Sequence, residues 1–153
     1  MVGSNNFKSS YELGKKYEDL AIQDRLMSIN FTEYEQAPAR QFPDWDLRIR
    51  SEGKPWVSYE VKADTKAYNT RNLYIEFEHT HKPSGIALTK ADYHLFFILD
   101  PLDVNQYVEL IECQTRNIRE FIETYKPRTA TCKNSGWNPS VGYLINIEKF
   151  MEF

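Results

Sequence analysis

The sequence predicts an α/β (α+β) fold in which an N-terminal helix precedes a mixed β-sheet flanked by further helices. Three observations lead to this prediction. Apolar residues recur at helical spacing near the N-terminus, the pattern changes to alternation after Phe31, and a second helical pattern covers residues 115–125. The chain has 153 residues, of which 41% are hydrophobic. This length suits one sizeable core, so we expect residues 1–153 to form a single domain.

Several classes of protein are excluded by the composition. The longest apolar run, Leu95 to Leu99, is too short for a bilayer span, and residues 1–10 lack the apolar core of a signal peptide. Two cysteines, Cys113 and Cys132, are too few for a disulfide framework, so we expect free thiols. The expected location is the cytoplasm, without a membrane partner. A net charge of −3 gives no general signal for polyanion binding.

The first element is a helix predicted from Ser10 to Met27. Ser9 and Glu12 form a capping box, and Leu13 and Tyr17 begin an apolar stripe. Alternation then predicts strands at Trp45–Arg50, Trp56–Ala63 and Leu73–Glu78. The apolar run Leu95–Leu99 predicts a buried strand, and further strands are expected at Asn105–Glu112 and Gly142–Ile147. Turn residues at 51–55 join the first two of these strands into a hairpin. Further helices are expected at Thr89–His94 and Thr115–Tyr125.

One acid-x-Lys triplet lies within a predicted strand. Glu60 and Lys62 flank Val61, so both side chains project from one face while Val61 points into the core. The hairpin brings a second carboxylate opposite, and Asp46, inside its strand, is preferred over Asp44, which lies just before it. Glu60 and Lys62 could also form an exposed ion pair at a sheet edge.

These residues resemble the signature of the PD-(D/E)XK nuclease superfamily. Pro43-Asp44-Trp45-Asp46, a hairpin and then Glu60-Val61-Lys62 follow a helix that carries Gly14 and Glu18. The resemblance covers roughly the first 100 residues and is closest to small stand-alone bacterial and phage members. One departure is Arg71, where related members often have glycine.

The resemblance implies a restriction-endonuclease-like core and an Mg²⁺-dependent endonuclease that hydrolyses DNA, with Mn²⁺ as a substitute ion. Metal ligands would be Asp46 or Asp44, Glu60, Glu18 and the carbonyl of Val61. Lys62 would orient or deprotonate water and stabilise charge. Alternatives are a structure-specific enzyme such as a Holliday-junction resolvase, a non-catalytic nucleic-acid-binding domain, and an interaction domain. A homodimer is possible.

DNA contacts are expected from basic residues around the site. No acid occurs between Glu123 and Glu148, and this segment is read as a basic loop. Arg116 and Arg119, on the preceding helix, are expected to matter less. Glu76 either reaches the site or faces solvent, and His79, His81 and His94 are weaker metal candidates. The expected DNA contacts are Lys66, Arg71, Lys90, Lys126, Arg128 and Lys133.

Overall fold

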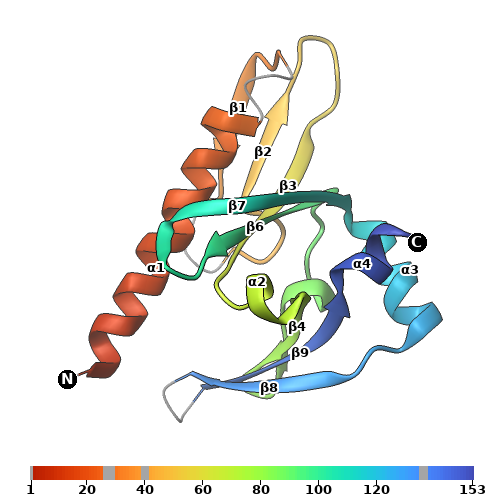
Figure 1. Ribbon diagram of the computed structural model, residues 1–153. Helices are drawn as coiled ribbons and strands as arrows, with labels where there is room; N and C mark the ends of the chain where they lie inside the picture. The colour runs from red at the N-terminus through yellow and green to blue at the C-terminus, as the bar shows by residue number, and fades with distance from the viewer. Residues whose placement is uncertain (1, 26–29, 39–41, 135–137) are drawn as a thin grey trace.

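The computed structural model describes residues 2–25, 30–38, 42–134 and 138–153, in which helices pack against two β-sheets (Figure 1). The five-stranded sheet has the order β1-β2-β3-β6-β7, with β3 and β6 parallel and the other neighbours antiparallel. Its strands are β1 Glu33–Gln36, β2 Leu47–Arg50, β3 Val57–Asp64, β6 Tyr93–Asp100 and β7 Asp103–Gln114. The expected mixed α+β class is confirmed.

The second sheet is antiparallel and has the order β5-β4-β9-β8. Its strands are β4 Asn72–His79, β5 Lys82–Pro83, β8 Thr129–Asn134 and β9 Asn138–Asn146. The helices are α1 Val2–Leu20, continued by a π-helical turn Ala21–Arg25, then α2 Ala67–Thr70, a 3₁₀ turn Gly85–Ala87, α3 Thr115–Tyr125 and α4 Ile147–Met151. Figure 1 shows α1 along the five-stranded sheet, and α3 and α4 beside the C-terminal end of β9.

Strand β6 separates two hydrophobic cores. Leu95, Phe97 and Leu99 join the core under α1, which also contains Tyr17 and the inward residues of β2 and β3. Phe96 and Ile98 point the other way, into the core formed with β4, β9, α3 and α4. The uninterrupted apolar run of β6 therefore reflects a strand buried on both faces.

The β2–β3 hairpin gives the site its platform. Leu47 pairs with Tyr59 and Ile49 with Val57, as the turn chemistry at 51–55 predicts. Tyr59 and Val61 pack toward α1. Glu60 and Lys62 consequently project from the opposite face of β3.

Four expectations about the elements are wrong. Helix α1 begins at Val2, so Ser9 and Glu12 lie inside it; no proline interrupts this stretch. Residues 89–94 form no helix, because Tyr93 and His94 already pair with Tyr59 and Glu60 in the parallel ladder. Strand β4 belongs to a second sheet, and the basic segment after α3 is largely the β8–β9 hairpin. The expected helix end at Met27, and Trp137 of the basic segment, lie outside the described residues.

No helix in the described ranges combines the length and the apolar character needed to cross a membrane. Cys113 and Cys132 are free thiols, as expected, and both are partly buried.

Gly85 offers a test of how the 3₁₀ turn is held. Its φ is +52°, and a Cβ added there would lie 2.2 Å from the carbonyl oxygen of Glu76. Gly85→Ala should destabilise the protein by about 3 kcal/mol or more, since left-handed strain and a backbone clash act together. Gly53→Ala is the matched control, because its φ is +74° but its Cβ would meet nothing within 4 Å. Equal losses in urea unfolding would show that the close approach is unimportant.

Candidate functional site

Asp46 is fixed against the acid-x-Lys triplet by two contacts with β3. Its backbone N–H donates to the carbonyl of Tyr59 at 3.0 Å. Its carboxylate oxygen Oδ2 accepts the backbone N–H of Val61 at 2.8 Å. The second contact takes the place of a main-chain ladder bond where β2 begins, so the carboxylate is held beside β3.

Glu60 is a nearly buried carboxylate, with 7% of the residue exposed. Oε1 accepts a hydrogen bond from the Thr89 hydroxyl at 3.1 Å, and Oε2 lies 3.4 Å from Lys62 Nζ. Burial raises the pKa of Glu60 to about 7, and the nearby Asp46 adds to the increase, while Lys62 and Thr89 oppose it. Asp46 and Glu60 therefore act on one another as neighbouring carboxyls.

Glu18, on α1, belongs to the same group of acids. Burial raises its pKa to about 7, followed by repulsion from Asp46, while Lys15 lowers it. Lys15 Nζ is 3.8 Å from the Glu18 carboxylate. Asp46 and Glu60 both raise the pKa of Glu18, so its carboxyl lies close enough for their charges to act on it.

Lys62 is the cation beside these acids. Its side chain is 43% exposed. Glu60, Asp46 and Glu76 raise the pKa of Lys62, against the effect of burial. Lys62 is thus a stable ammonium in this arrangement. The sequence left open whether Glu76 reaches the site or faces solvent. Its carboxylate lies close enough to raise the pKa of Lys62.

Asp44 lies next to the site but faces another partner. Its carboxylate is 3.7 Å from Lys90 Nζ. Its backbone carbonyl accepts from Lys90 N at 2.8 Å and lies 3.1 Å from the Thr89 hydroxyl oxygen. Of the two candidate aspartates, Asp46 is the one whose carboxylate is bonded to β3.

Thr89 and Arg119 are site residues that the sequence did not indicate. Thr89 is 3% exposed, and its hydroxyl reaches Glu60. Arg119 Nη2 donates to the carbonyl of Thr89 at 2.7 Å and to that of Ile86 at 3.2 Å. Arg119 therefore fixes the segment that carries Thr89. No sequence pattern signals an arginine bonded to distant carbonyls.

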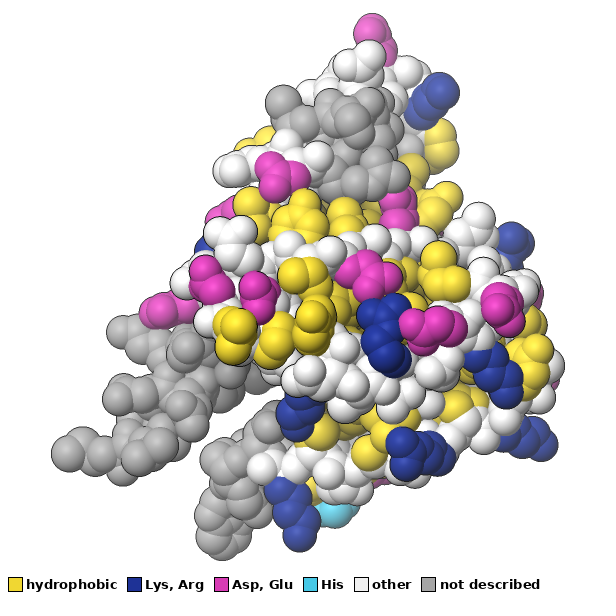
Figure 2. Space-filling model, in the orientation of Figure 1, with side chains coloured by type: hydrophobic (Ala, Val, Ile, Leu, Met, Phe, Trp, Pro, Cys, Tyr) yellow, Lys and Arg dark blue, Asp and Glu magenta, His cyan; other side chains and the backbone are white. Residues whose placement is uncertain are grey.

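A cleft of about 570 Å³ opens beside Lys62, between the end of β3, α2 and the second sheet. Lys66 and Arg128 line it, and so does Tyr74, whose hydroxyl lies 2.6 Å from Ser140 Oγ. Gly142 makes room for this ring, since a Cβ there would lie 2.6 Å from it. In the view of Figure 2, Lys and Arg side chains lie over the lower part of the molecule, where β8 and β9 lie, and Asp and Glu side chains lie mainly higher up, over β7.

The other expected DNA contacts are dispersed. Arg71 bonds the carboxylates of Glu148 at 2.7 Å and Glu109 at 2.9 Å, so its charge is compensated. Its φ is +55°, the left-handed region that favours glycine. Lys90 lies on the Asp44 side of the site. Within the described part of the chain, the cleft lining does not include Lys126 or Lys133.

The described histidines do not form a cluster. His79 and His81 are exposed at the β4–β5 turn, whereas His94 is buried on β6 and not at a helix end as expected. His94 Nδ1 lies 2.8 Å from Thr115 Oγ1. Burial lowers the pKa of His94 to about 3, so the ring is neutral.

Among residues 2–25, 30–38, 42–134 and 138–153, no three His, Cys, Asp or Glu side chains are arranged to hold a metal ion together. The pair Asp46 and Glu60, with Glu18 nearby, consists of the oxygen donors that Mg²⁺ prefers. The raised pKa values of Glu60 and Glu18 also reflect mutual repulsion that a cation would relieve. The donor chemistry therefore fits a hard divalent cation. Comparison with known proteins finds no matching family model, no matching curated protein and no matching solved structure.

The raised pKa of Glu60 has a consequence for stability. The folded protein retains this proton up to about pH 7, so the stability associated with protonation is lost as the pH rises through that value. Glu60→Gln should therefore stabilise the metal-free protein at pH 8 relative to pH 5, by on the order of 2 kcal/mol. Urea unfolding in EDTA measures this, with Glu52→Gln on the exposed 51–55 turn as the control for the amide substitution. A gain that is equal at both pH values would contradict the burial of charge.

Proposed function

We propose that this protein is a metal-dependent endonuclease of the PD-(D/E)XK type that hydrolyses DNA phosphodiester bonds. The observation that carries the proposal is the bond between the Asp46 carboxylate and the backbone N–H of Val61, at 2.8 Å. It joins the two halves of the sequence signature, the hairpin aspartate and the Glu60-Val61-Lys62 triplet. The structure-specific nuclease remains an alternative within this class.

Asp46 and Glu60 would hold Mg²⁺, with Mn²⁺ as a substitute, aided by the Val61 carbonyl and by Glu18. A bound divalent cation supplies a nucleophilic water at neutral pH and neutralises charge on the scissile phosphate. Thr89 orients the Glu60 carboxylate through its hydroxyl. Arg119 acts one step further away, as a positioning residue that fixes the backbone of Thr89.

The resemblance allows Lys62 to orient or to deprotonate the attacking water, and we propose the first of these roles. Because neighbouring carboxylates raise its pKa, it remains an ammonium and is a poor general base. A partly exposed ammonium suits electrostatic stabilisation of charge that develops on the phosphate oxygens. It also suits orientation of the attacking water, to which it donates.

Substitutions at Lys62 and Asp46 test the catalytic assignment. Lys62→Ala should reduce Mg²⁺-dependent cleavage of plasmid DNA at least 100-fold while DNA affinity stays within about threefold, because the ammonium stabilises the transition state more than the bound substrate. Asp46→Asn should reduce cleavage similarly by weakening metal binding. Lys54→Ala, on the turn far along the hairpin, is the control. Cleavage that persists undiminished in EDTA would refute a metal mechanism, and DNA binding without any cleavage would favour the non-catalytic alternative.

The cleft predicts which basic residues bind DNA. The double substitution Lys66→Glu and Arg128→Glu should weaken DNA binding at least tenfold and lower the slope of log K against log salt by about 0.9 for each phosphate that the variant no longer neutralises. Lys126→Glu with Lys133→Glu changes the same total charge outside the cleft and is the matched control. Titrations in Ca²⁺ at several salt concentrations measure both. Equal effects of the two pairs would mean that only overall charge matters.

A further inference from the structure

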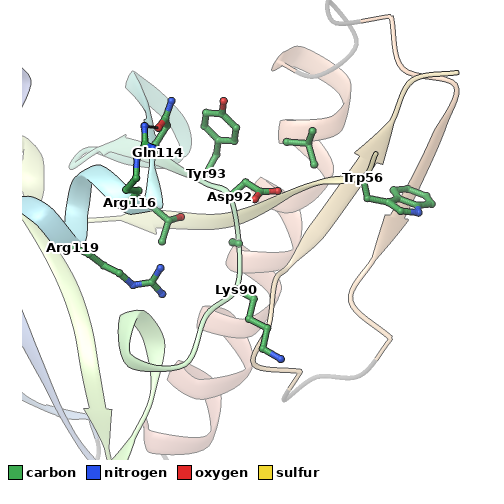
Figure 3. A pocket seen from close by; sticks show the side chains of 10 residues that line it. Trp56, Lys90, Asp92, Tyr93, Gln114, Arg116 and Arg119 are labelled. Atoms are coloured by element: carbon green, nitrogen blue, oxygen red, sulfur yellow. Dashed lines mark hydrogen bonds between the residues drawn. The ribbon is translucent and has the colours of Figure 1, made fainter. Parts of the chain in front are cut away.

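A second pocket, of about 540 Å³, lies behind the segment that carries Thr89 (Figure 3). Its walls are the start of β3, residues 90–93 and the first turns of α3. Figure 3 shows Arg119 and Arg116, with Gln114 beside Arg116, on one side of the pocket and Trp56 at the opposite end. Lys90 and Asp92 project from the segment that runs between these two ends.

Positive charge exceeds negative charge in this lining. The lining contains three basic side chains, those of Lys90, Arg116 and Arg119, and one carboxylate, that of Asp92. The Asp92 carboxylate is already engaged, since its Oδ2 accepts from Ser58 N at 2.9 Å and from Ser58 Oγ at 3.1 Å. A second acid, Asp44, pairs with Lys90, whose side chain is 76% exposed, so that pair is weak.

Both arginines have donors to offer. Arg116 Nη2 donates to the neutral Gln114 side chain at 3.0 Å. Arg119 uses Nη2 for the two carbonyls, and its Nε and Nη1 have no hydrogen-bond acceptor among the described residues. An arginine fork with free N–H groups matches the oxygens of a phosphate. Arg48 and Arg50 lie over the ring of Trp56, at the rim of the pocket, at 4.4 and 4.7 Å.

We infer that this pocket binds a backbone phosphate of the DNA strand, next to the phosphate that is cleaved. This inference rests on the proposed function and adds a substrate contact to it. Thr89 connects the two places, since its hydroxyl meets Glu60 and its carbonyl meets Arg119. A duplex strand carries one phosphate per ~3.4 Å of helix axis, so a strand that reaches the acidic site presents further phosphates beside it.

Arg119 links the pocket to the acidic site. Arg119 binds the strand and also holds the carbonyl of Thr89, so occupation of the pocket stiffens the support of Glu60. Arg116 makes no hydrogen bond to the Thr89 segment within the described part of the chain, so its substitution tests phosphate binding alone.

The experiment measures binding of a fluorescent DNA duplex in EDTA, where cleavage plays no part. Arg116→Ala, and separately Arg116→Gln, should weaken binding about threefold to tenfold and lower the salt slope by about 0.9, the value for one phosphate contact. Lys54→Ala should leave the slope unchanged. In the wild-type protein, the Nε–H NMR signals of Arg116 and Arg119 should shift when DNA is added.

Unchanged affinity, slope and arginine signals would overturn the inference. Signals that shift with inorganic phosphate but not with DNA would show a small-anion site and would also overturn it. Cleavage is assayed separately in Mg²⁺: an inactive protein whose DNA binding still depends on Arg116 refutes the nuclease proposal but retains the pocket. A protein that cleaves DNA but whose DNA binding does not depend on Arg116 retains the nuclease proposal and refutes the pocket.

Discussion

The polar contacts of β3 are arranged around one constraint, the buried carboxylate of Glu60. An ionised carboxylate in such a place requires a counter-charge and hydrogen bonds. Lys62 supplies the first and Thr89 the second. The neighbouring Asp46 works against both, because it adds a like charge and raises the pKa of Glu60. Under the proposed function, a bound cation would take the place of the proton that Glu60 otherwise retains.

The segment from residue 85 to residue 92 connects the carboxylates of Asp46 and Glu60 to the surrounding basic surfaces. It is fixed at one end by the close approach of Gly85 to β4 and at the other by the bonds of Asp92 to Ser58. Arg119 holds its middle. A short backbone segment anchored at both ends and in the middle can place Thr89 accurately on Glu60, whereas an unsupported loop would not.

The local features of the site could be predicted from the sequence, and its long-range features could not. Alternation around Val61 correctly placed Glu60 and Lys62 on one face, and the helical pattern over residues 115–125 predicted the bounds of α3. The second sheet produced no such signal, because β4 pairs with a distant strand at residues 138–146. The polar stretch in β8 resembles a loop when read alone. Arg119 has backbone acceptors, which no residue pattern reveals.

The crossover between β3 and β6 also bears on the order in which the chain can assemble. These parallel strands join residues 59–64 to residues 93–98, and the connection contains β4. Strand β4 is in turn held by β9. As the polypeptide leaves the ribosome, the hairpin with Asp46 and Glu60 can form early, but Glu76 and the turn at Gly85 lack their support until β9 has emerged. Assembly of the complete site is thus delayed until residues 138–146 have left the ribosome, and contacts of such sequence separation form slowly.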